Sequence, residues 1–224
     1  MNVDTAPDRQ RTTVRSPGVR DTVLDIVLGM HADRTWGRTS MERIASAAGV
    51  SRQTLYNQFG SRDGVTQALL SRETGRLSYG VDRRWRQVRS RGGNPADCLT
   101  AAMSWVLAVS HDHPLLPAVL TGLDHNAACT PLTALWNAPA DHLGIHGRGA
   151  GAVAAVTELC RRLDTAEHGG HPDRLRGVEA VVRLTVSYLL VPAATTRARS
   201  QIAQAARSLL PDNGPPVRRG PLNA

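Results

Sequence analysis

Six hydrogen-bonding side chains are concentrated in one short segment of the chain. They are Arg52, Gln53, Thr54, Tyr56, Asn57 and Gln58. An arginine can form two hydrogen bonds to guanine, and a glutamine or asparagine can do the same with adenine. Threonine and tyrosine hydroxyls can bind backbone phosphates. These residue types favour contact with a nucleic-acid duplex, although they would also suit the solvated side of an ordinary helical hairpin.

The segment around these residues is a helix, a glycine turn and a second helix. Thr39 and Glu42 have the spacing of a capping box, which predicts that the first short helix begins with Thr39 as its N-cap. Gly49 can adopt a left-handed turn without a Cβ clash. Ser51 is a good N-cap for the second helix, residues 52–59, and its free amides attract an anion. Inward-facing apolar residues hold the two helices together; they are Met41, Ile44, Ala45, Ala48, Val50, Leu55 and Phe59.

Amphipathic periodicity predicts helices through most of the remaining chain. A first helix begins at Val19 and ends near residues 35–37, with Val19, Val23, Ile26, Val27 and Met30 on one face. Gly, Pro and Asn breaks separate the later helices. Their expected ranges are 62–90, 95–111, 114–124, 128–138, 150–167, 173–192 and 197–210.

Composition limits the possible functions. The formal charge is +8, and all 27 basic residues are arginines, but residues 1–75 carry ten arginines against eight acidic residues. The global charge therefore permits a nucleic-acid partner without pointing to the N-terminal part. The three scattered cysteines, the lack of an apolar leader and the lack of a long apolar run favour a reduced, cytoplasmic protein with no membrane partner.

The stretch from residue 19 to 70 resembles the N-terminal domain of the TetR family of bacterial regulators. The family pattern joins a Thr-Ser/Thr-hydrophobic-x-x-Ile-Ala helix to Ala-Gly-Val-Ser-x-x-Thr-Leu-Tyr-x-x-Phe-x-Ser-Lys/Arg. The matching residues are Thr39, Ser40, Ile44, Ala45, Ala48, Gly49, Val50, Ser51, Thr54, Leu55, Tyr56, Phe59, Ser61 and Arg62. Gly64 departs from the pattern, since the family usually has a helix former there.

The resemblance implies a role for each matched polar residue. Thr39 and Ser40 would contact phosphate, and Tyr56 and Arg62 would do the same. Bases would be read by Arg52, Gln53 and Asn57, while Thr54 and Gln58 would reach base or phosphate. Gly64 is expected to loosen the joint behind the motif.

The resemblance also implies an all-α fold of about nine to ten helices. A three-helix helix-turn-helix DNA-binding domain, residues 17–63, would precede a larger effector-binding and dimerisation domain, residues 64–210. Residues 1–16 would form a flexible arm and residues 211–224 a disordered tail. The function implied is a homodimeric repressor that leaves its DNA operator when a small-molecule effector binds. The dimer would form through the last two long helices, although the apolar segment 180–192 could equally be a central helix of a monomer.

Other residues allow alternative functions. Residues that could line an effector pocket are Met103, Trp105, Leu116, Leu120, Leu135 and Trp136. The pairs His111/His113 and His142/His146 could each share a metal ion. No Glu accompanies His142/His146 in the hydrolase spacing, and residues 111–114 suit a helix end, so we expect no metal and no cofactor. The arginines from Arg83 to Arg91 suit a solvated helix face. Nucleophile elbows, phosphate loops and zinc-hydrolase motifs are missing, so we expect no enzyme, and the alternative is a helical small-molecule-binding module or enzyme that does not act on DNA.

Overall fold

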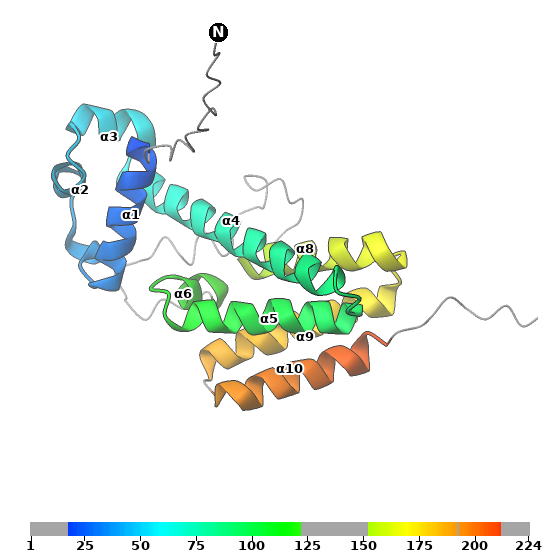
Figure 1. The fold of residues 1–224 in the computed structure, drawn as a ribbon. Helices are drawn as coiled ribbons and strands as arrows, with labels where there is room; N and C mark the ends of the chain where they lie inside the picture. Colours follow the sequence, from blue (N-terminus) through cyan, green and yellow to red (C-terminus); the bar gives the residue numbers. More distant parts are fainter. Residues whose placement is uncertain (1–17, 122–151, 192, 212–224) are drawn as a thin grey trace, which may run out of the picture.

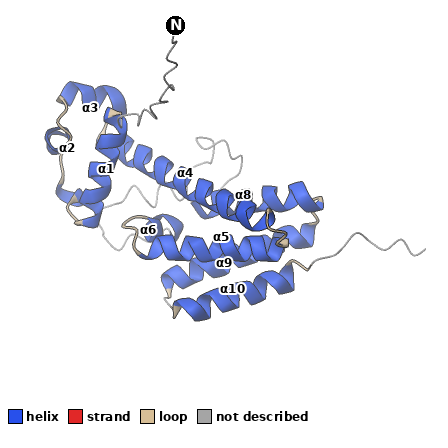
Figure 2. Ribbon diagram, in the orientation of Figure 1, coloured by secondary structure: helices blue, strands red, loops and turns tan. Residues whose placement is uncertain are grey.

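The computed structural model describes residues 18–121, 152–191 and 193–211, and this part of the chain is entirely helical (Figure 2). The predicted all-α fold is confirmed. The observed elements, with the 3-10 turn labelled η1, are α1 Val19–Ala32, η1 Trp36–Arg38, α2 Met41–Ala47, α3 Arg52–Phe59, α4 Arg62–Arg89, α5 Pro95–His111, α6 Leu116–Thr121, α8 Ala152–His168, α9 Pro172–Leu190 and α10 Thr195–Leu209. The predicted arm, tail and helix at 128–138 lie outside the described residues.

The described chain has two hydrophobic cores joined by one long helix (Figure 1). We call the part built from α1, η1, α2, α3 and the start of α4 the head, and the part built from the rest of α4 and α5 to α10 the body. The head core surrounds Val27, Ile44 and Leu55, each at most 1% exposed. The body core surrounds Trp85, Met103 and related residues on α4, α5, α8, α9 and α10. Helix α4 supplies side chains to both cores, so its axis fixes how the head is placed on the body.

Short polar side chains define where the helices begin. The Ser51 hydroxyl accepts a hydrogen bond from the Thr54 amide at 3.0 Å, as predicted for its N-cap position. The capping box predicted at Thr39 is wrong, because Ser40 is the N-cap and accepts from the Arg43 amide at 3.3 Å. Thr39 is instead 5% exposed, and its hydroxyl donates to the Thr35 carbonyl at 2.9 Å.

Three residues show how backbone geometry restricts the head. Gly49 has a φ of 63°, the left-handed conformation predicted for the turn between α2 and α3. Gly64 was expected to loosen the joint, but a Cβ there would lie 1.8 Å from the Phe59 carbonyl oxygen. Glycine therefore allows the start of α4 to pack closely on the end of α3. Arg34, after α1, has the left-handed φ of 55° without being glycine.

A buried ion pair joins α8 to α9 in the body. Asp164 is fully buried, and its two carboxylate oxygens accept from Arg174 at 2.7 and 3.2 Å. The same guanidinium donates to the Pro211 carbonyl at 2.9 Å. Because two-point contacts between arginine and carboxylate fix both side chains, this pair holds three segments of the body together.

Candidate nucleic-acid interface

The outer face of α3 presents the predicted row of hydrogen-bonding side chains. Leu55 and Phe59 point into the head core and are 1% and 8% exposed. All α3 side chains predicted to contact DNA are exposed or half-buried; these are Arg52, Gln53, Thr54, Tyr56, Asn57 and Gln58. The 3.6-residue helical period produces this separation, since residues four apart share one face. The outward orientation predicted for these α3 side chains and the inward orientation predicted for Leu55 and Phe59 are confirmed, while DNA contact by the outward side chains stays a prediction.

Interactions within α3 hold part of this face in a defined geometry. The side-chain amide of Gln53 donates from Nε2 to the side-chain oxygen Oδ1 of Asn57 at 2.8 Å, across one helical turn. The hydroxyls of Ser51 and Thr54 lie 2.8 Å apart. Arg52 lies 3.8 Å from Glu42 of α2 and is 70% exposed, so its guanidinium remains accessible. Hydrogen bonds therefore order Gln53 and Asn57 before any ligand arrives.

Glu42 is the acidic residue closest to Arg52 on this surface. Hydrogen bonds from its own backbone amide and from the Ser40 hydroxyl hold the pKa of the Glu42 carboxyl below its ordinary value, and the Arg52 charge also lowers it. The side chain is therefore ionised at neutral pH. It turns the Arg52 guanidinium toward α2 and partly offsets its charge.

Arg43 is an exposed basic residue on α2 that was not among the predicted DNA contacts. It helps line an open hollow between α2 and α3 together with Ser40, Ser46 and Arg52. Arg43 lies one helical turn after Ser40 on the solvent side of α2. This i, i+3 spacing from a predicted phosphate contact was available in the sequence, and it makes Arg43 a second basic residue beside Arg52.

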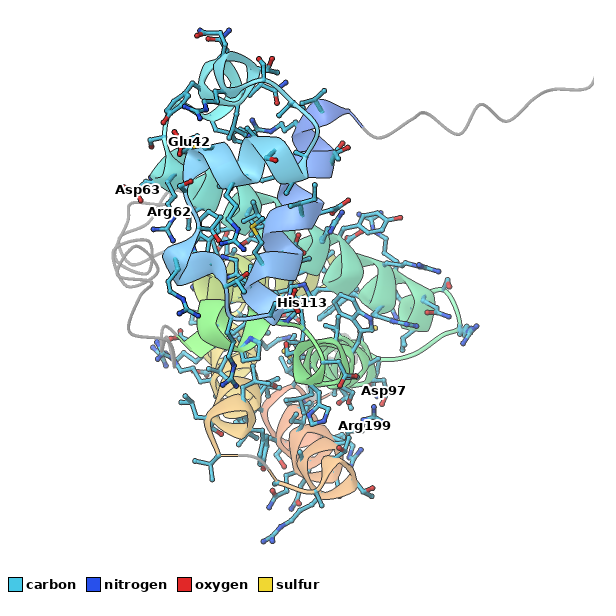
Figure 3. The ribbon with its side chains drawn as sticks, turned by 90° about the vertical axis from the view of Figure 1, so that its left-hand side faces the viewer. Glu42, Arg62, Asp63, Asp97, His113 and Arg199 are labelled. Atoms are coloured by element: carbon cyan, nitrogen blue, oxygen red, sulfur yellow. The ribbon has the colours of Figure 1, made fainter. Side chains whose placement is uncertain are left out.

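Two residues predicted to contact phosphate occupy different surroundings. Thr39 is buried and its hydroxyl is already bonded to Thr35, so we remove it from the interface. Arg62 is half-buried, with its guanidinium 4.5 Å from the centre of the Trp36 ring and donating to the Trp36 carbonyl. Figure 3 shows Arg62 at the start of α4, close to the 3-10 turn. Arg62 therefore ties α4 to η1, and its predicted role as a phosphate clamp is withdrawn.

Arg20 of α1 contacts the C-terminal end of α3. Its guanidinium lies 5.0 Å from the centre of the Phe59 ring and donates to the Gln58 carbonyl at 3.5 Å. Cation–π contacts of this kind stabilise by about 0.5–1 kcal/mol at exposed sites. Together with the Phe59 side chain in the core, this contact fixes the C-terminal end of α3 against α1.

The predicted pocket residues belong to the packing of the body. Met103, Leu116 and Leu120 are buried members of the body core, at most 3% exposed. Trp105 is half-buried, and its indole packs so closely on Gly80 of α4 that a Cβ there would lie 1.8 Å away. Leu135 and Trp136 lie outside the described residues. A cavity lined by this set stays a prediction.

The predicted histidine pairs do not form a metal site in the described segments, where no group of three or more metal-ligating side chains occurs. His111 is exposed, whereas the His113 ring bonds to protein groups on both sides. His142 and His146 lie outside the described residues. None of the helices in the described parts of the chain is long and apolar enough to span a membrane.

The fold and the exposed polar face of α3 define a helix-turn-helix protein. Residues 28–69, which lie in the head, match the family described as bacterial regulatory proteins of the tetR family. The HTH-type transcriptional regulator AlkX of Mycobacterium tuberculosis is 35% identical over 105 residues, which cover 47% of this chain and 48% of that protein. A second, uncharacterised HTH-type transcriptional regulator of that species is 34% identical over 101 residues, covering 45% and 48%. The match thus spans about half the length of these curated relatives.

Solved structures resemble a larger part of the chain. The TetR family repressor AlkX from a Dietzia strain has a TM-score of 0.55 at 22% identity, covering 87% of this chain and 96% of that one. A tetR-family regulator from Streptomyces coelicolor gives 0.57 at 19%, covering 85% and 79%. The fatty acid degradation regulator FadR from Bacillus halodurans gives 0.53 at 14%, covering 89% and 98%. The described chain therefore has the fold of TetR-family regulators, including the helical body.

Proposed function

We propose that the chain is a sequence-specific DNA-binding transcriptional regulator that acts as a homodimeric repressor and leaves its operator when an effector binds. The observation that carries this proposal is the polar face of α3. Its side chains are exposed while Leu55 and Phe59 anchor the helix in the core. A helix held in this way can enter a major groove with its N-terminal half.

The interface divides into base readers and phosphate contacts. Gln53 and Asn57 share a hydrogen bond and lie one turn apart, so they form one reading unit, and Arg52 can reach guanine beside them. Ser40, Ser51 and Tyr56 suit phosphate contacts, and Arg43 joins them from α2. Thr54 and Gln58 lie between these groups, within reach of base or phosphate.

Binding is tested by fluorescence anisotropy with two DNA probes. One is the intergenic duplex directly upstream of the gene that encodes the chain, and the other is a duplex selected from a randomised library. We expect Arg52→Ala to weaken binding by about 1–3 kcal/mol at its base position. Arg162→Ala is a matched control, because Arg162 on α8 is 61% exposed and also pairs with a glutamate one turn away.

The test has a defined failing result. Affinity should fall steeply with salt, because phosphate contacts release counterions. The double variant Arg52→Ala, Tyr56→Ala should lose binding to both probes, while the Arg162→Ala control binds as the parent does. Parent-level affinity in the double variant would refute the proposed interface.

We assign the dimer contact to α9 and α10, which form one side of the body in Figure 1. Large apolar side chains remain uncovered at the ends of these helices: Leu190 is 45% exposed, Val191 74% and Leu209 42%. Such residues are stabilising when a partner covers them. A twofold dimer would also place two heads at half-sites about 34–36 Å apart, which is one turn of DNA.

Sedimentation equilibrium tests this dimer. Val191→Glu should shift the chain toward monomer because the charge would be buried against the partner. Val19→Glu is the matched control, since Val19 on α1 is 41% exposed and lies on the head. Equal dimer stability in both variants would exclude α9 as the contact.

We further propose that the effector is apolar. Within the described body the buried basic side chain is Arg174, which is already engaged with Asp164 and Pro211 and so is not available to an anionic effector. Of the two structural relatives, the Dietzia AlkX repressor is implicated in biodegradation of n-alkanes, and FadR is a regulator of fatty acid degradation. If a long-chain alkane or alcohol releases the upstream duplex and the matching carboxylate does not, the result supports an apolar effector. Release by the carboxylate but not by the alkane or alcohol contradicts it.

A further inference from the structure

The head and the body meet at two consecutive leucines before and within α6. Leu115 is 3% exposed and belongs to the head core, together with Val27 and Leu69. Leu116 is also 3% exposed but belongs to the body core, together with Leu120. One peptide bond thus separates two side chains that pack in different cores. Any movement of the start of α6 therefore displaces a side chain in the head core and a side chain in the body core.

His113 fixes the position of this peptide. Its Nδ1 accepts hydrogen bonds from the backbone amides of Leu115 and Leu116, both at 3.2 Å. A nitrogen that accepts carries no proton, so the proton of the neutral ring is on Nε2. Nε2 lies 3.3 Å from a carboxylate oxygen of Glu73 on α4, within reach to donate to it. The ring therefore bonds to the start of α6 through Nδ1 and to α4 through Nε2.

Glu73 continues the connection toward α1. Its side chain is 3% exposed, and its other oxygen accepts from Arg72 Nε at 2.9 Å and from Arg76 Nη1 at 3.2 Å. Arg72 also lies 2.8 Å from the Asp25 carboxylate and donates to the Asp21 carbonyl of α1 at 3.3 Å. A continuous series of polar contacts thus runs from the start of α6, through α4, to the first helix of the head.

The electrostatics of Glu73 explain why this connection holds one arrangement. Burial raises the pKa of the Glu73 carboxyl. The hydrogen bond from His113 and the charges of Arg76 and Arg72 lower this pKa by more than burial raises it, so the pKa lies below its ordinary value. A buried carboxylate that loses a donor is strongly destabilised. The charged side chains around the His113 ring are Glu73, Arg72 and Arg76 from α4, with Asp25 of α1 beyond them.

We propose that His113 is a positioning residue that sets the orientation of the DNA-binding head from the start of α6. The inference rests on the proposed function, because orientation of the head matters only if the head binds DNA. With His113 in place, a displaced α6 would take the His113 donor away from Glu73 Oε2, or leave the Leu115 and Leu116 amides without an acceptor. The head therefore follows α6 and does not move independently of it.

Two conservative substitutions separate the two nitrogens of the ring. In His113→Asn, the amide oxygen takes the place of Nδ1 and can still accept from the α6 amides, but the shorter side chain no longer reaches Glu73 Oε2. In His113→Gln, the amide nitrogen takes the place of Nε2 and can still donate to Glu73, but the cap of α6 is lost. The matched control is His111→Ala, because His111 is exposed two residues earlier.

Amide hydrogen exchange of the full-length chain measures the connection without DNA. His113→Asn should leave exchange in residues 115–121 unchanged and raise it in α1, residues 19–32, by about tenfold. His113→Gln should raise exchange in residues 115–121 by a similar factor and spare α1. The His111→Ala control should match the parent in both segments. Parent-level exchange of α1 in His113→Asn would overturn the proposal, since the ring would then serve only as a cap.

A DNA-binding measurement separates this inference from the proposed function. If the parent binds the upstream duplex, His113→Asn should bind it about tenfold more weakly, because fewer molecules hold the head in the binding orientation. Equal affinity of the variant and the parent would overturn the role of His113 alone. If the parent binds no duplex, the proposed function fails, while hydrogen exchange still decides whether the contact joins the head to the body.

Discussion

Removing the carboxylate of Asp164 would leave a charged guanidinium buried in the body. In Asp164→Ala, Arg174 loses both hydrogen bonds to the carboxylate and keeps the Pro211 carbonyl, which is neutral. Since the Arg174 side chain is 9% exposed, water cannot readily replace the lost partner. The change therefore tests how much the buried pair contributes to the stability of the body.

The expected loss can be estimated from the burial of both partners. Breaking a buried ion pair by removing one side costs about 3–5 kcal/mol. This is a large fraction of the roughly 5–15 kcal/mol that stabilises a typical protein. For a chain of this size, about 2–4 °C of melting temperature are lost per kcal/mol, so the variant should melt roughly 6–20 °C lower.

Urea unfolding followed by circular dichroism measures this loss at equilibrium. Arg176→Ala is the matched control, because Arg176 on the same helix forms a 3.0 Å pair with Asp173 in which both side chains are more than 75% exposed. That variant should lose at most about 0.5 kcal/mol. Replacing both buried partners by apolar residues should recover much of the loss. If Asp164→Ala were no less stable than the control, the assignment of the pair as a buried structural contact would be refuted.

Three further changes test other parts of the structure. Arg34→Gly should stabilise the chain by about 0.5–1 kcal/mol in urea unfolding, because the left-handed backbone no longer clashes with a Cβ; a loss of stability would contradict this. Gly64→Ala should destabilise by about 1–3 kcal/mol in thermal unfolding because of the clash with the Phe59 carbonyl, despite the better helix propensity of alanine. Since the folded pKa of Glu73 lies below 4.5, its contribution is present above that pH and is lost as pH falls further. Glu73→Gln should therefore reduce stability at pH 7 and flatten the decrease in stability below pH 4.5, and an unchanged acid profile would contradict the assignment.

The local parts of the interface were predictable from the sequence. Ser51, Gly49, Leu55 and Phe59 each follow from a rule about one turn or one helical period, and the structure has them as expected. The N-cap of α2 was predicted one residue too early, at Thr39 in place of Ser40, because both residues carry a hydroxyl that can cap a helix. Which of them caps the helix depends on the path of the preceding 3-10 turn.

The non-local contacts could not be predicted in the same way. Arg62 bonds to Trp36, which lies 26 residues earlier, and no local pattern identifies a cation–π partner. Leu115 lies beside a second leucine of equal hydrophobicity, and only the tertiary fold assigns it to the head core. The connection between Glu73 and His113 likewise requires α4 and α5 to be packed side by side.

The length of α4 makes it a lever. Its 28 residues span about 42 Å at 1.5 Å per residue, and both cores are attached to the same rod. A tilt of roughly 5° at the body end displaces the other end by about 3.7 Å, which slightly exceeds the 3.4 Å rise of one base pair along a strand. An angular change too small to disturb the packing of the body is therefore enough to move the reading surface by one step of the double helix.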